Sequence, residues 1–144
     1  MQIPLTYALP LLIYSAVALR FGLLHREHIN TDAVCYIRRA QYLLHGQWYY
    51  FISENWSLMI SWLIAPLMAL HIDGLYAARI VNGCIGGAFI VAFVSLAGRL
   101  LQIHWAWRLL AGAILAPFIA AVAMRAISPD LLLATWLKIG RAHV

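Results

Sequence analysis

The chain has 144 residues, of which 65% are hydrophobic and 10% are charged, and its mean hydropathy is +0.83. Soluble domains are about half apolar and a quarter charged, so this composition excludes an ordinary soluble protein and indicates an integral membrane protein. The formal net charge is +5. Because the arginines are scattered among apolar runs, the sequence argues against a nucleic-acid partner.

The first apolar run extends over residues 3–24 and is about as long as a helix that crosses a hydrocarbon core. A signal peptide is the alternative, because Ala16-Val17-Ala18 resembles a small-residue cleavage site. However, no Lys or Arg precedes the run, and the run continues to Leu24. We therefore expect an uncleaved transmembrane helix.

Residues 31–62 form the one long stretch polar enough to lie outside a bilayer, and we expect them to belong to an outer loop over residues 25–74. Thr31 and Asp32 are residue types that begin helices, and the apolar residues after them recur at helical spacing up to Gly46. This pattern predicts an amphipathic helix on the membrane surface. We expect its two adjacent arginines, Arg38 and Arg39, to face lipid headgroups.

The run from Trp56 to Leu70 is about fifteen residues long and contains Pro66, which is short for a crossing. It predicts a second juxtamembrane helix that does not cross the membrane. With this choice, Asp32 and Asp130 lie on the same face of the membrane; a crossing here would put them on opposite faces.

Further crossings are predicted over residues 75–101 and 109–127, with a fourth helix that starts at Leu131. The spacing Gly83-x-x-x-Gly87 gives the first of these a small face for close helix packing. The loop between the two long crossings is bordered by basic residues and contains two tryptophans, Trp105 and Trp107. Arg99, His104 and Arg108 mark this loop as cytoplasmic, although Arg26, Arg38 and Arg39 would then lie outside, which the same rule disfavours.

Residues 139–144 resemble the translation of a sequencing adapter, and Lys138 is partly suspect for the same reason. We expect 138–144 to be a non-native tail and 1–137 to be the N-terminal part of a longer membrane domain.

Several short motifs follow one another in a fixed order. Asp32 is followed by Tyr36; Trp-Ser and Ser-Trp-Leu-x-x-Pro occur within 56–66, Ala-Arg-x-x-Asn-Gly at 78–83, and Ser-Pro-Asp-Leu-Leu-Leu at 128–133. In this order the chain resembles the GT-C membrane glycosyltransferases, in particular the bacterial relatives of protein O-mannosyltransferases and aminoarabinose transferases. Ala33 stands where many of those relatives have a second acid.

The resemblance implies an all-α, polytopic membrane bundle of the GT-C type, with a large first extracytoplasmic loop that carries two juxtamembrane helices. It implies a multi-pass enzyme of the bacterial inner membrane. Such an enzyme transfers a sugar, with inversion, from a polyprenyl-phosphate donor to a hydroxyl of a lipid, glycan or protein acceptor. The present chain alone is expected to be inactive.

By motif match, Asp32 is the general base that takes the proton of the acceptor hydroxyl. The leaving phosphate calls for arginine or a metal. No cofactor is established by the sequence, and a divalent metal remains open. The other candidate substrate-binding residues are Tyr36, Arg79, Arg125, Asp130, Glu54 and Trp56, of which Glu54 and Asp130 are also possible metal ligands.

Simpler roles compete with these assignments. Asp32 and Asp130 are also typical helix N-caps, and Arg79 and Arg125 are placed to snorkel toward headgroups. A non-enzymatic transporter or flippase subunit is the alternative for the whole chain, but such proteins hold polar groups at mid-membrane depth. Asn82 and Ser95 are the notable residues of that kind.

Overall fold

The computed structural model describes residues 2–52, 58–100, 104–127 and 129–141, and within these ranges it is helical without strands. The local sequence explains most of the helix ends, because Gly, Pro, Asn and Asp gather between the apolar runs. In chain order the helices are α1 Gln2–Leu24, α2 Thr31–Leu44, α3 Trp48–Phe51, α4 Leu58–Ala69, α5 Gly74–Leu100, α6 Trp105–Arg125 and α7 Asp130–Arg141.

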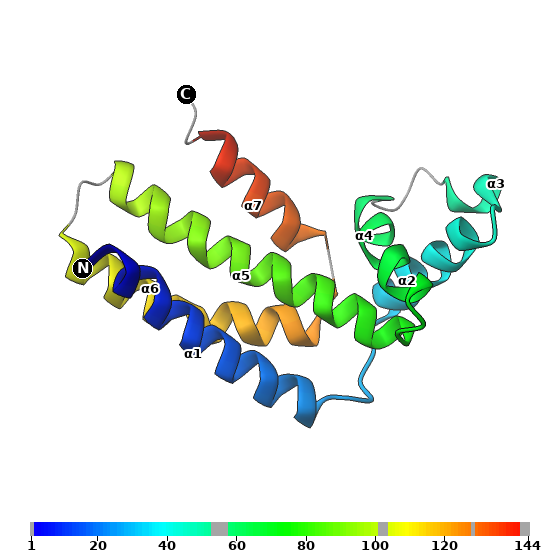
Figure 1. Ribbon diagram of the computed structural model, residues 1–144, viewed down its shortest axis with the longest axis horizontal. Helices are drawn as coiled ribbons and strands as arrows, with labels where there is room; N and C mark the ends of the chain where they lie inside the picture. Colours follow the sequence, from blue (N-terminus) through cyan, green and yellow to red (C-terminus); the bar gives the residue numbers. More distant parts are fainter. Residues whose placement is uncertain (1, 53–57, 101–103, 128, 142–144) are drawn as a thin grey trace.

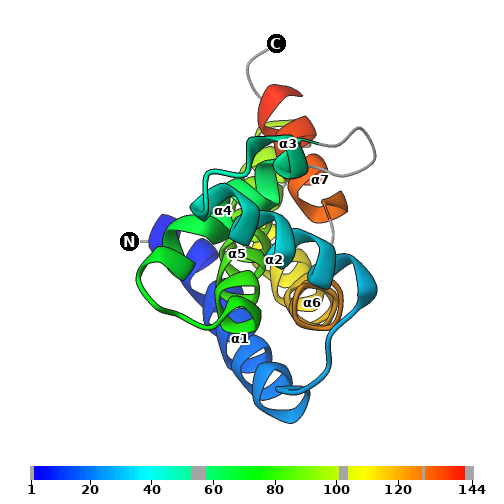
Figure 2. The ribbon, with the colours of Figure 1, turned by 90° about the vertical axis from the view of Figure 1, so that its right-hand side faces the viewer.

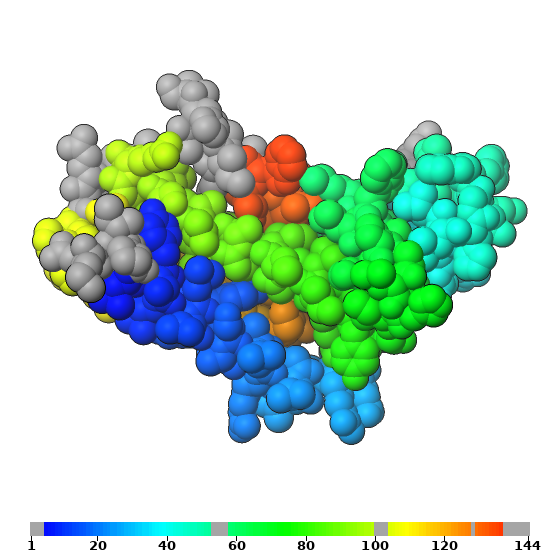
Figure 3. All heavy atoms as spheres, viewed as in Figure 1, coloured from blue at the N-terminus to red at the C-terminus, as the bar shows by residue number. Residues whose placement is uncertain are grey.

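Three helices are long and apolar enough to cross a membrane, over Leu5–Leu24 in α1, Gly74–Arg99 in α5 and Trp105–Arg125 in α6. Their surfaces carry many large exposed apolar side chains, which suit a lipid environment and would be a liability in water. Figure 3 shows α1 and α5 as one continuous surface along the molecule. The exposed side chains include Leu12, Leu19, Ile114, Phe118 and Val122.

The helices α1 and α5 are antiparallel. Early in α1, the Tyr7 hydroxyl accepts a hydrogen bond from Ser95 Oγ at 3.3 Å, and further along, the Tyr14 hydroxyl donates to the Gly83 carbonyl at 2.7 Å. As residue numbers rise along α1 they fall along α5, so the end of α1 meets the start of α5 (Figure 1). The predicted small face of α5 is confirmed as a packing surface, although Gly86 makes the tightest approach to Tyr14.

The third spanning helix, α6, packs against both of the others, antiparallel to α5 and parallel to α1. Its last turn is held by Asn82 of α5, whose side-chain amide donates to the carbonyls of Ala123 at 2.7 Å and Ala126 at 3.0 Å. The three helices share a core in which small residues of α6 allow close packing. That core comprises Tyr14, Ala18, Ile90, Val94, Ala116 and Ala120.

Between α1 and α5, the chain forms α2, α3 and α4, which gather at the end of the bundle where α1 ends and α5 begins (Figures 1 and 2). Ala33, Tyr36 and Ala40 of α2 pack with Ile60 and Ile64 of α4 in one apolar core. The helix α4 has 12 residues, within the run of residues 56–70 for which the sequence predicts a juxtamembrane helix. It is shorter than the three helices that could cross a membrane.

Two predicted boundaries are wrong. The helix α6 begins at Trp105, four residues before the expected start at Leu109, so Trp105 and Trp107 are helical and not in a loop. His104 is its N-cap, and the ring Nδ1 accepts from the Ala106 N–H at 3.4 Å, which satisfies one of the free donors of the first turn. The helix α7 begins at Asp130, one residue before the predicted start at Leu131.

Candidate functional site

A single asparagine joins two distant loops at the end of the bundle. Asn30 Nδ2 donates to the Ile127 carbonyl at 3.2 Å, and Asn30 Oδ1 accepts from the Ile127 N–H at 3.2 Å. Asn30 precedes α2, and Ile127 follows α6. Because this pair fixes the two chain segments against each other, it brings the start of α2 close to the start of α7.

Asp32 lies in the first turn of α2 and is half-buried, whereas Asp130 is the first residue of α7 and is exposed. The expectation that Thr31 and Asp32 cap α2 is wrong: Asn30 is the N-cap residue, and its side chain is used by Ile127. Neither carboxylate makes a side-chain hydrogen bond or ion pair within the described residues.

The pKa of Tyr36 is affected by both acids. It lies one turn after Asp32 on the same face of α2 and is 2% exposed. Burial raises the pKa of the Tyr36 phenol above its ordinary value of 10.0, and the negative charges of Asp32 and then Asp130 raise it further, while Arg39 acts in the opposite direction. The phenol therefore stays protonated at neutral pH and can donate a hydrogen bond.

Arg39 corrects another expectation. It is 5% exposed and belongs to the buried face of α2, whereas Arg38 is exposed and donates from Nε to the Tyr42 hydroxyl at 2.9 Å. The predicted basic patch of two headgroup-facing arginines is thus wrong for Arg39. Helical spacing could have shown this, because Arg39 shares a face with Ala33, Tyr36 and Ala40.

Arg79 holds the loop that leads into α2. Its guanidinium donates to the carbonyls of Arg26 at 2.7 Å and His28 at 2.8 Å, and also to that of His25. Those carbonyls lie just past the end of α1, where helices leave acceptors without intrahelical partners. The side chain is 7% exposed, so it neither snorkels nor presents an open fork to a phosphate.

The other predicted arginine is different. Arg125 ends α6, is exposed, and has no hydrogen bond or ion pair with any residue in the described ranges. Arg125 lies at the same end of the bundle as Asp130 and remains a candidate for binding a phosphate.

Two further predicted site residues, Glu54 and Trp56, lie outside the described residues.

The described part of the chain contains no group of three or more metal-ligating side chains, so the open question of a divalent metal gains no support from these residues. The two polar residues expected at mid-membrane depth both have partners in neighbouring helices. Asn82 holds the end of α6, and Ser95 donates to Tyr7. These bonds explain both residues as helix-packing groups.

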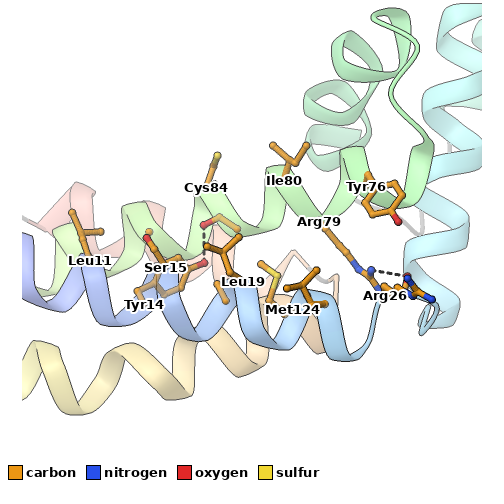
Figure 4. Close-up of a pocket in the computed structure, with 15 residues that line it drawn as sticks. Leu11, Tyr14, Ser15, Leu19, Arg26, Tyr76, Arg79, Ile80, Cys84 and Met124 are labelled. Atoms are coloured by element: carbon orange, nitrogen blue, oxygen red, sulfur yellow. Dashed lines mark hydrogen bonds between the residues drawn. The ribbon is translucent and has the colours of Figure 1, made fainter.

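A groove of about 630 Å³ lies between α1 and α5 (Figure 4). Its walls are mostly apolar, and its charged groups, Arg26 and Arg79, lie with Tyr76 at the end near the loop after α1. Tyr14, Ser15 and Cys84 also line the groove, further from that loop. Sequence reasoning missed this groove because its walls come from two helices that are far apart in the chain.

Comparisons of the chain with protein-family models, with curated proteins and with solved structures found no match.

Proposed function

We propose that this chain belongs to a membrane glycosyltransferase that transfers a sugar from a lipid-phosphate donor to an acceptor hydroxyl. The observation that carries the proposal is the pair of hydrogen bonds between Asn30 and Ile127, which brings Asp32 at the start of α2 close to Asp130 at the start of α7. The two acids lie at one end of three apolar helices. An acid–base centre at the end of the apolar helices, where membrane and water meet, suits a reaction between a membrane-held donor and a polar acceptor.

In the proposed reaction, the acceptor oxygen attacks the anomeric carbon while Asp32 takes the hydroxyl proton. The bond between the anomeric carbon and the phosphate oxygen breaks, and the lipid phosphate leaves with the electron pair, which inverts the configuration. Arg125 stabilises the charge on the leaving phosphate, and Asp130 orients the acceptor or Arg125.

The basic residues Arg99, His104 and Arg108 lie toward the opposite end of α5 and α6 from Asp32. Arg26, Arg38 and Arg39 lie at the Asp32 end, so the positive charges do not orient the chain by themselves. The proposed extracytoplasmic site in a bacterial inner membrane rests on the resemblance to the GT-C enzymes. No observation of comparable strength favours a transporter, since Asn82 and Ser95 are engaged in helix packing.

The test is sugar transfer in membranes in which the full-length protein is produced. Replacing Asp32 by Asn keeps the size of the side chain but removes the base, so we expect transfer from a polyprenyl-phosphate sugar to fall by about 10²-fold or more. Asp73→Asn is the matched control: it removes the same charge at the same end, and an Asn oxygen can still accept from the Leu75 N–H as Asp73 does at 2.9 Å. Undiminished transfer by Asp32→Asn, with normal expression, would remove Asp32 from the mechanism.

A further inference from the structure

The groove between α1 and α5 has the dimensions of one membrane leaflet. Its lining runs from Leu11 to Leu23 on α1 and from Tyr76 to Gly87 on α5, which at the helical rise corresponds to about 16–18 Å. Half of a hydrocarbon core is about 15 Å. The groove therefore reaches from one interface to roughly the middle of the membrane.

The polarity of the groove follows the same axis. Toward mid-membrane the walls carry no charged group: Leu11 and Leu19 lie there with Ser15 and with Tyr14, whose hydroxyl donates to the Gly83 carbonyl, whereas Arg26 and Arg79 lie at the interface end (Figure 4). A membrane lipid has the same layout, with a charged head at the interface and a chain in the hydrocarbon. The volume of about 630 Å³ lies within the usual range for ligand sites.

The charge at the interface end is suited to an anion. Within the described residues the Arg79 guanidinium contacts carbonyl groups and no carboxylate, so its charge is not neutralised locally. Arg26 has one acidic neighbour, Glu27 at 3.6 Å, and both side chains are exposed. Exposed pairs of this kind contribute little free energy, so a phosphate can displace Glu27 from Arg26.

We propose that this groove binds an anionic phospholipid of the leaflet at this end, with one acyl chain between α1 and α5 and the phosphate against Arg26. Arg79 contributes its charge and holds the loop that carries Arg26. The site is separate from the proposed sugar transfer and does not depend on it.

The experiment is native mass spectrometry of the purified chain in mild detergent, titrated with dioleoylphosphatidylglycerol and, separately, with dioleoylphosphatidylcholine. We expect the phosphatidylglycerol to bind more tightly, and Arg26→Gln to weaken its binding about fivefold. Arg20→Gln is the matched control, because Arg20 is an exposed arginine in the last part of α1, shortly before Arg26 in the chain, and does not line the groove. Equal affinity for the two lipids, or equal binding by the two variants, would overturn the proposal.

A second pair of variants tests whether the acyl chain of the lipid lies in the groove. Cys84 lines the groove and is exposed, so Cys84→Phe fills the groove without disturbing the core, and we expect it to weaken binding of phosphatidylglycerol. Val91→Phe adds similar bulk two turns along the same face of α5, beyond the groove, and should bind normally. Equal binding by these two variants would exclude the groove as the site. Displacement of phosphatidylglycerol by an equal concentration of undecaprenyl phosphate, through the same residues, would reassign the groove to the donor lipid.

Discussion

The most informative residue at the candidate site is Tyr36, because it reports on both acids. Its position one turn after Asp32 follows from the helical spacing alone. Its closeness to Asp130 does not follow from the spacing, because Asp130 lies on α7. The hydrogen bonds between Asn30 and Ile127 hold the start of α7 close to the start of α2. The sequence could therefore predict half of this arrangement, and the tertiary contact supplies the rest.

The titration of Tyr36 tests this geometry directly. The two carboxylates raise the pKa of the phenol by disfavouring the phenolate, so replacing Asp130 by Asn should lower that pKa, and Asp32→Asn should lower it as well. The measurement is the NMR titration of a ring-labelled tyrosine, assigned with Tyr36→Phe. Asp73→Asn should leave the Tyr36 pKa unchanged. An unchanged pKa in Asp130→Asn would mean that Asp130 is not close to the phenol.

The arginines show why residue type alone assigns roles poorly in a membrane protein. Arg38 and Arg39 are adjacent in sequence, yet one is exposed and the other buried, because successive helical residues point about 100° apart. Arg79 matches the motif for a donor-binding arginine, but its guanidinium binds three loop carbonyls. The helical spacing could have predicted that Arg39 is buried. The hydrogen bonds of Arg79 could not be predicted in this way, because their acceptors lie more than fifty positions away in the chain.

At the scale of elements, the periodicity and length of the apolar runs predicted the spanning helices to within about four residues, in keeping with the usual uncertainty at helix ends. The errors have local causes. His104 extends α6 by capping it one turn early, and Asn30 takes the cap position expected for Thr31 and Asp32. The short helix α3 was not predicted, because four residues carry little periodic signal.

The α1–α5 interface depends on the absence of a side chain at Gly86. A Cβ there would overlap the Tyr14 hydroxyl and lie 2.9 Å from the ring carbon that bears it. Gly86→Ala should therefore displace Tyr14 and break its bond to the Gly83 carbonyl, which would lower the free energy of unfolding by about 1–3 kcal/mol. The measurement is the unfolding midpoint in mild detergent.

The adjacent glycine gives the control for that substitution. At Gly87 the nearest atom to an added Cβ is a ring carbon of Tyr14 at 3.8 Å, which is an ordinary contact. Gly87→Ala should therefore leave stability unchanged or raise it slightly, because alanine favours the helix. Equal losses in the two variants would show that helix packing, and not the Tyr14 contact, sets the cost.

At the scale of the whole molecule, one feature decides whether the two acids can act together. The contacts of Tyr7 with Ser95 and of Tyr14 with Gly83 make α1 and α5 antiparallel, and Asn82 fixes the end of α6 beside the start of α5. The polar segment between α1 and α5 and the link between α6 and α7 must then share one end. From the sequence, the prediction that both acids lie at one end depends only on the run of residues 56–70 being too short to cross the membrane. Composition alone does not give the direction of each helix.

Cysteine labelling across a sealed membrane tests that arrangement. In a background with Cys35 and Cys84 replaced by Ser, single substitutions Glu27→Cys, Asp130→Cys and His104→Cys place thiols at exposed positions. An impermeant thiol reagent added to one side should label Glu27→Cys and Asp130→Cys together and leave His104→Cys unlabelled, and inverted vesicles should give the opposite result. The reason is that residues 27 and 130 lie at one end of the three apolar helices and residue 104 at the other. Protection of Asp130→Cys from a reagent that labels Glu27→Cys would separate Asp32 from Asp130 by the membrane, and no acid–base centre could then contain both.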